Sequence, residues 1–139
     1  MKILVINGPN LNLLGKREPE VYGERTYSEL EEFIRKSAAG AEIEIRQSNH
    51  EGEIVEWIQR SVDEGFEALV INAAAYTHSS IAILDAIRAV GIRTVEVHLT
   101  DIAAREEFRR VSYVGMAAEA VFKGKGFQSY AEAIGYLLK

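Results

Sequence analysis

Residues 2–7 read KILVIN, a short run of aliphatic side chains that stops at a polar asparagine. Four similar runs follow along the chain, at 42–47, 68–72, 93–98 and 119–123. Short runs rich in Val, Ile and Leu are typical of parallel strands that are covered on both faces. The sequence therefore predicts five buried strands.

Amphipathic stretches separate these runs, at 28–39, 52–64, 80–90 and 129–138. Strands that alternate with helices predict βαβ units with right-handed crossovers. We expect an α/β fold, a flavodoxin-like doubly wound five-stranded parallel sheet with strand order 2-1-3-4-5. Because no repeat or linker interrupts the pattern, residues 1–139 are expected to form a single domain.

The composition narrows the class of protein. Hydrophobic residues make up 47% of the chain and charged residues 27%, and the net charge is -5. That charge opposes broad attraction to nucleic acid or to an anionic membrane, so we expect neither as a partner. The sequence has no cysteine, which excludes disulfides and thiolate chemistry. The apolar run at 3–6 is shorter than a secretory h-region of about 7–15 residues, so a cytoplasmic location is expected.

One segment, residues 8–26, has no convincing periodicity. Loops between a strand and a helix usually run about 2–6 residues, so a connection this long is typical of a functional lid. The segment contains Arg17 and Tyr22. A free tyrosine has a pKa of about 10, and a nearby guanidinium favours the phenolate that a tyrosine base requires. Arg17 is the candidate for that role, although a surface loop with scattered polar residues is an equal alternative.

Polar side chains concentrate where the predicted strands end, which is where ligands bind in open parallel sheets. His98 ends its strand, and Glu96 lies on the same side two residues earlier. A carboxylate in that position can orient the imidazole and support its protonated form, so His98 is a candidate general acid. His50, by contrast, is expected to be structural. His78 and His98 lack the spacing and carboxylates of a metal site, and no metal is expected.

The charged segment after the fourth strand holds Arg105 and Arg109, which would share one face of a helix. It reads equally well as a solvated surface helix. The GKG triplet at 124–126 is a weak nucleotide signal, because it follows the last strand and Ser129 occupies the third glycine position.

Five blocks of sequence, in order and at matching spacing, resemble the type II 3-dehydroquinate dehydratases over essentially the whole chain. They are GPNLNLLG at 8–15 with REP at 17–19 and YG at 22–23, QSNHEG at 47–52, YTH at 76–78, VEVH at 95–98, and REEFR at 105–109 with SY at 112–113.

The resemblance implies removal of water from 3-dehydroquinate through an enolate, without a cofactor, as a step of the shikimate pathway. It implies Tyr22 as the base, supported by Arg17, with Asn10 stabilising the enolate and His98, oriented by Glu96, as the acid. Substrate contacts are implied for Asn72, His78 and Arg109, and for the backbone N–H groups of Leu99 and Thr100. Arg105 is expected to order the lid or the neighbouring loop. Family members assemble as dodecamers of trimers, in which the aspartate matching Asp85 reaches a neighbouring site.

Some positions depart from the family pattern. Ala73 and Ala74 stand where Pro-Gly usually follows Asn72, which predicts a different loop. Asp101 stands near the expected substrate carboxylate, where it would repel unless it points away. Two other readings remain: a non-catalytic flavodoxin-like binding module, and a nucleotide-binding protein. Retention of Tyr22, Arg17 and His98 together argues against a simple binder, which needs no paired base and acid.

Overall fold

The core of the molecule is a five-stranded parallel sheet in the order β2-β1-β3-β4-β5. The strands are β1 (Lys2–Asn7), β2 (Glu42–Gln47), β3 (Ala68–Asn72), β4 (Arg93–His98) and β5 (Ala120–Lys123). A computed structural model provides this description, and it covers residues 1–16 and 18–139. The predicted fold class and strand order are confirmed, and β5 begins one residue later than predicted.

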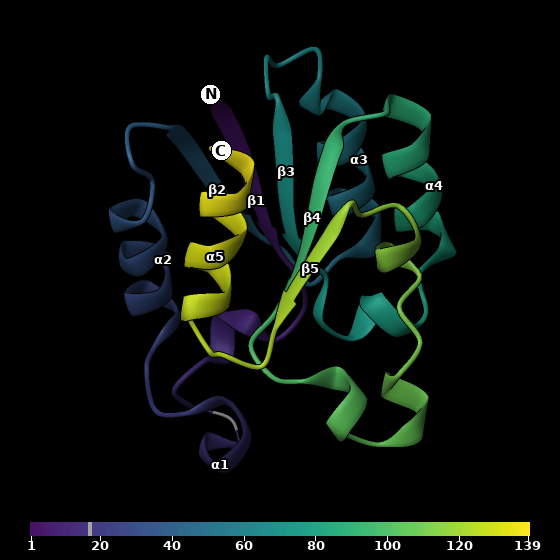
Figure 1. Ribbon diagram of the computed structural model, residues 1–139. Helices are drawn as coiled ribbons and strands as arrows, with labels where there is room; N and C mark the ends of the chain where they lie inside the picture. The colour runs from purple at the N-terminus through teal and green to yellow at the C-terminus, as the bar shows by residue number, and fades with distance from the viewer. Residues whose placement is uncertain (17) are drawn as a thin grey trace.

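Two helices cover each face of the sheet (Figure 1). They are α2 (Tyr27–Lys36) and α5 (Gln128–Leu137) on one face, and α3 (Glu51–Ser61) and α4 (Ile81–Val90) on the other. Alternation along β1 explains both layers, since successive side chains of a strand point to opposite faces. Ile3 and Val5 pack in the cluster with α2 and α5, while Leu4 and Ile6 pack in the cluster with α3 and α4.

The helix ends differ from the predicted bounds for local reasons. Thr26 and Glu29 form a capping box, so α2 begins at Tyr27, one residue earlier than predicted. Gly91 adopts φ 68° and ends α4 in the left-handed conformation, as expected. The other predicted glycine stops lie beyond the observed ends, because α2 ends at Lys36 and α3 at Ser61. No helix of the described ranges is long and apolar enough to cross a membrane.

The long segment at residues 8–26, which we call the lid segment, contains two short helices. They are η1 (Leu11–Leu13) and α1 (Pro19–Tyr22). Leu11 and Leu14 are buried in the cluster beneath α2 and α5. The segment is therefore anchored to the core on one side, and the predicted long loop is a chain of short turns.

The segment after β4 is not the helix that the charge spacing suggested. It forms three short 3-10 turns, η3 (Ile102–Ala104), η4 (Glu107–Arg109) and η5 (Val114–Met116). The backbone N–H of Arg109 donates to Glu106 O at 2.9 Å, a bond between residues three apart rather than four. The expected shared helical face of Arg105 and Arg109 is thus wrong, because the chain turns too tightly there.

Candidate active site

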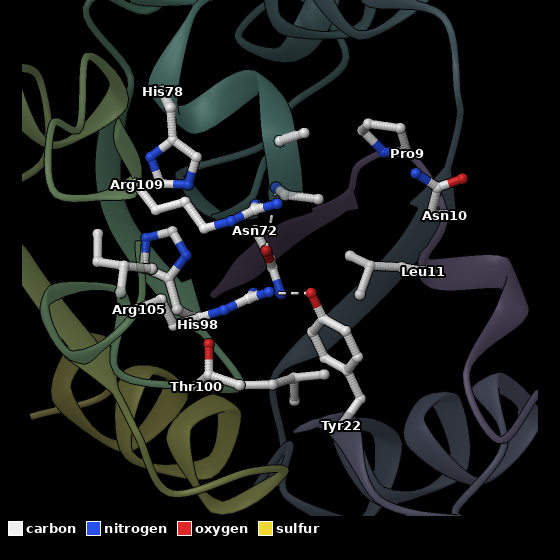
Figure 2. Close-up of a pocket in the computed structure, with 14 residues that line it drawn as sticks. Pro9, Asn10, Leu11, Tyr22, Asn72, His78, His98, Thr100, Arg105 and Arg109 are labelled. Atoms are coloured by element: carbon white, nitrogen blue, oxygen red, sulfur yellow. Dashed lines mark hydrogen bonds between the residues drawn. The ribbon is translucent and has the colours of Figure 1, made fainter. Parts of the chain in front are cut away.

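A cavity opens where β1, β3 and β4 end (Figure 2). The lid segment lies at the same edge of the sheet (Figure 1). It encloses ≈ 620 Å³, part of which is open to solvent. Figure 2 shows His78, His98 and Arg109 on one side of this space and Pro9, Asn10 and Leu11 on the other. Eight residues predicted from the sequence line it: Asn10, Tyr22, Asn72, His78, His98, Leu99, Thr100 and Arg109.

His98 and Glu96 form a buried hydrogen-bonded pair, as the strand pattern predicted. Nε2 of His98 lies 2.6 Å from Oε2 of Glu96, and both residues are nearly inaccessible to solvent. Burial by itself would raise the pKa of Glu96, but the hydrogen bonds from His98 and Ser112 and the charge of His98 outweigh it, so the pKa is lowered. Since the carboxylate accepts, Nε2 of His98 donates and Nδ1 is the nitrogen left for chemistry in the cavity.

Ser112 completes the support of Glu96. Its hydroxyl donates to Oε2 of Glu96 at 2.5 Å and its oxygen accepts from the backbone N–H of Gly115 at 2.8 Å. A Cβ on Gly115 would lie 2.8 Å from Oε1 of Glu96. Glycine at 115 therefore allows the backbone to approach the carboxylate of Glu96, which is held by His98 on β4 and by Ser112 after it.

Tyr22 meets a guanidinium, but the one that the structure describes beside it is that of Arg105. Nη1 of Arg105 donates to the hydroxyl of Tyr22 at 2.8 Å, and the guanidinium carbon lies 5.4 Å from the ring centre (Figure 2). Arg17, the predicted partner, lies outside the described residues. The expectation that Arg105 orders the lid segment agrees with this contact, since Tyr22 belongs to that segment.

Arg109 is held at the cavity by an acidic neighbour. Its Nε donates to Oε2 of Glu106 at 3.1 Å, and this bond is the main cause of the lowered pKa of Glu106. Arg105 also lies near that carboxylate, with Nε 3.8 Å from Oε1. One exposed glutamate thus steadies two cationic side chains that face the same cavity.

Asn10 is placed by contacts from β2 and the turn after it. It adopts φ 70°, in the left-handed region that asparagine tolerates better than most residues. Its backbone N–H donates to Oδ1 of Asn49 at 2.9 Å, and Nε2 of Gln47 donates to Gly8 O at 3.1 Å. Gln47 and Asn49 therefore hold the loop that presents Asn10.

The loop after Asn72 has backbone angles that a Pro-Gly pair could also adopt. Ala73 has φ -76°, within the range of proline, and Ala74 has φ 53°, where glycine is favoured. The backbone N–H of Ala74 donates to Oδ1 of Asn72 at 3.1 Å. Ala74 therefore occupies a backbone conformation that is strained for a residue other than glycine.

His78 is held in a defined tautomer. Its Nδ1 lies 2.8 Å from Val111 O, and because a carbonyl only accepts, this nitrogen carries the hydrogen. Burial lowers the pKa of His78. A neutral ring in this orientation offers Nε2 as an acceptor for a substrate hydroxyl.

Asp101, the second departure, points away from the cavity. Its Oδ1 accepts from the backbone N–H of Ala103 at 3.0 Å and lies 3.4 Å from Nζ of Lys123. It is absent from the cavity lining, whereas its neighbour Thr100 is part of it. The hydrogen bond to Ala103 and the ion pair with Lys123 therefore keep the Asp101 carboxylate away from the expected substrate carboxylate.

Other predicted residues lie outside the cavity of this chain. Asp85 is exposed on α4, and Glu96 acts only through His98. His50 is exposed at the start of α3 and does not line the cavity. Within the described ranges, no group of three His, Cys, Asp or Glu residues is arranged to hold a metal ion.

Several residues that line the cavity were not predicted from the sequence. Arg105 was assigned to loop ordering only, and Pro9, Leu11, Ala75 and Ile102 line the cavity without having been singled out. Arg105 and Tyr22 are 83 positions apart, so no local pattern links them. The available signal was their shared presence in blocks that resemble one family.

Comparison with known proteins agrees with this geometry. The family model described as dehydroquinase class II matches residues 1–138. A 3-dehydroquinate dehydratase of Thermus thermophilus is 52% identical over 139 residues, covering 97% of this chain and 92% of that protein. The 3-dehydroquinate dehydratase of Phenylobacterium zucineum is 52% identical over 134 residues, covering 95% and 92%. The crystal structure of a type II dehydroquinase from Butyrivibrio crossotus superposes with TM-score 0.97 at 44% identity, covering 100% of this chain and 98% of that chain.

Proposed function

Because the chain belongs to the dehydroquinase class II family, we propose that it removes water from 3-dehydroquinate to give 3-dehydroshikimate, as a hydro-lyase of the shikimate pathway. One observation carries the proposal. A tyrosine hydroxyl bonded to a guanidinium and a histidine bonded to a buried carboxylate line the same cavity. Elimination of water next to a ketone requires a base and an acid in that relationship.

Tyr22 is the proposed base. As the phenolate, it takes the C2 proton of the substrate, which lies next to the ketone, and electrons move into an enolate. Arg105 stabilises the phenolate through its charged N–H donor. Arg17 remains a second proposed contributor to the same effect.

Asn10 is proposed to stabilise the enolate oxygen, through an ordered water, as negative charge develops on it. It lines the cavity from the lid side, across from His98 (Figure 2). Its loop is fixed by Gln47 and Asn49, so little reorganisation accompanies the step.

His98 is the proposed acid. When protonated, it gives a proton from Nδ1 to the C1 hydroxyl as the carbon–oxygen bond breaks, and water leaves. Glu96 accepts from Nε2 and supports the imidazolium before this transfer. The proton balance closes when Tyr22 loses its proton and His98 regains one. The chain's own residues thus supply both transfers, and we propose no cofactor.

Substrate recognition is proposed for the polar residues around the base and the acid. Asn72, His78 and Arg109 hold substrate hydroxyls, and the backbone N–H groups of Leu99 and Thr100 hold its carboxylate. All five line the cavity. Asp101 is directed to Lys123, which leaves the carboxylate position free of a competing charge.

We also propose that the chain self-assembles into a dodecamer built from trimers, which is typical of the family. Asp85 would then complete a neighbouring site. Large apolar side chains are exposed on α4 and the turns after β4, among them Ile81, Phe108 and Met116. We propose that these side chains gather into one interface in the assembly, since large apolar patches mark protein interfaces. We propose that the enzyme works in the cytoplasm.

The test is incubation of the purified chain with 3-dehydroquinate while the ultraviolet absorbance of the conjugated enone is followed. Turnover by the unmodified chain is expected, and Tyr22→Phe should lower kcat by about 10³-fold, since a general base typically contributes about 10²–10⁴-fold. Tyr136→Phe should retain activity. It removes an exposed hydroxyl that is bonded to Glu119, just before β5, and neither residue lines the cavity. An unmodified chain without turnover at high enzyme concentration would refute the proposal.

A further inference from the structure

A network of hydrogen bonds, most of it buried, lies next to Asn72 of the cavity lining and joins four elements of the fold. The hydroxyl of Tyr130 on α5 donates to Oδ1 of Asn7 on β1 at 2.6 Å. Nδ2 of Asn72 on β3 donates to the same hydroxyl at 2.9 Å. Nδ2 of Asn7 donates to the hydroxyl of Tyr27 on α2 at 3.3 Å. None of these bonds was predicted, and the proposed chemistry uses only Asn72.

Three members of this network are shielded from water, and Tyr27 is half-buried. Tyr130 and Asn7 have no exposed surface and Asn72 is 3% exposed. A buried polar group that loses its partner is costly, so each bond constrains the next. Burial raises the pKa of Tyr130, and it raises the pKa of Tyr27 to about 12. Both phenols therefore keep their hydrogens at neutral pH.

The direction of each hydrogen bond in the network, from donor to acceptor, follows from these hydrogens. Tyr130 has one hydrogen, which it gives to Asn7, so it can only accept from Asn72. The backbone N–H of Ala74 donates to Oδ1 of Asn72, which confirms which end of the amide is oxygen. An amide nitrogen carries two hydrogens, and the bond to Tyr130 uses one. The other is available to a ligand in the cavity that Asn72 lines.

We propose that Tyr130, backed by Asn7, is a positioning residue that locks the Asn72 amide so that it offers an N–H donor to the substrate. The inference rests on the proposed function for the identity of the substrate, whose hydroxyl oxygen would accept this bond. It gives a role to a helix that contributes no residue to the cavity lining. Tyr27, at the start of α2, extends the same constraint to the end of the lid segment.

The first measurement is steady-state kinetics of Tyr130→Phe, which removes only the hydroxyl. KM for 3-dehydroquinate should rise about 10-fold while kcat stays within about 2-fold, because a binding contact equal in ground and transition states affects KM alone. Ser61→Ala is the matched control, since it also removes a buried hydroxyl bond, to Ile58 O at 2.7 Å on α3, away from Asn72. It should leave KM unchanged.

A double-mutant cycle separates positioning from general damage. In an Asn72→Ala background, Tyr130→Phe should change KM by less than about 2-fold, because the residue through which it acts is gone. An equal rise in KM in both backgrounds would overturn the inference. If Tyr130→Phe does not fold, Tyr27→Phe replaces it in the cycle, with a smaller expected rise of about 2–3-fold that also vanishes without Asn72.

Crystal structures of the unmodified chain and of Tyr130→Phe give a readout that needs no turnover. The Asn72 amide should rotate or shift in the variant, since its donor has lost its acceptor. An amide in the same position in both crystals would overturn the inference. A displaced amide together with an inactive unmodified chain would refute the proposed function alone and leave the positioning role standing.

Discussion

Arg105 places Nη1 2.8 Å from the hydroxyl of Tyr22, across 83 positions of sequence. A charged donor at that distance stabilises the phenolate more than the phenol, because the hydrogen bond strengthens as negative charge appears on oxygen. The pair therefore joins the turn between η3 and η4 to the lid segment through the atom proposed to take the substrate proton.

Arg105→Met should reduce kcat by about 10–100-fold, the equivalent of losing one hydrogen bond to a charged group. Arg110→Met removes the same charge from an exposed neighbour outside the cavity and should leave kcat within about 2-fold. Steady-state assays of both variants decide the matter. Full activity in Arg105→Met would show that another group carries the stabilisation.

Glu96→Gln should alter how stability depends on pH. Because the folded pKa of Glu96 lies below its ordinary value of 4.5, its contribution to stability is full above pH 4.5 and is lost as pH falls through the folded pKa. The variant should therefore be less stable than the unmodified chain at pH 7, and the gap should narrow below pH 4.5.

Urea unfolding at a series of pH values measures that gap. Glu56→Gln, at an exposed position of α3, controls for the loss of a carboxylate as such. A gap for Glu96→Gln that stays constant from pH 7 into the acid range would contradict the coupling of Glu96 to His98 and Ser112.

Gly115→Ala should disturb the buried carboxylate directly. The new Cβ would lie 2.8 Å from Oε1 of Glu96 and 3.0 Å from Oγ of Ser112, and neither group can move without breaking its hydrogen bonds. We expect a loss of about 1–3 kcal/mol in stability and a lower kcat, because the orientation of His98 depends on Glu96. Gly135→Ala on α5 meets no atom within 4 Å and should gain about 0.5–1 kcal/mol. Thermal unfolding and kinetics of the two variants form the comparison, and equal behaviour would argue against the crowding.

Ala74→Gly should relieve strain at φ 53°. A non-glycine residue in the left-handed region costs about 1–2 kcal/mol, whereas glycine in an ordinary conformation loses about 0.5–1 kcal/mol to backbone entropy. Ala75→Gly, at the next position of the same turn, incurs only that entropy loss and is the matched control. Chemical denaturation should therefore rank Ala74→Gly above Ala75→Gly by about 1–2 kcal/mol. The reverse order would mean that the loop is unstrained.

The sheet was predictable because its signal is local. Short runs that contain Val, Ile or Leu at 2–7, 68–72 and 93–98 predict strands, and the predicted bounds of these strands match the observed ones. Helix ends were less predictable, because α2 stops at Lys36 although the amphipathic pattern continues to residue 39. The residue at which a helix ends depends on the path of the turn that follows it. The amphipathic pattern of the helix carries no information about that path.

The candidate site was predictable where chemistry and strand periodicity coincide. Glu96 and His98 share one side of β4, so spacing alone placed their side chains together. The partner of Tyr22 was not predictable in this way, because the lid segment and the turns after β4 have no periodicity that fixes their approach. The turn at Ala73 and Ala74 shows the opposite limit, since neighbouring contacts keep a backbone shape that the residues themselves do not favour.

The bond between Tyr130 and Asn7 has a consequence for synthesis of the chain. The two residues are 123 positions apart, and α5 is the last of the described elements to leave the ribosome. Until α5 docks, Asn72 lacks the hydroxyl that fixes its amide, even if the strands have already paired. Pairing of the strands in a nascent chain would therefore leave the Asn72 amide unfixed until α5 has emerged and docked.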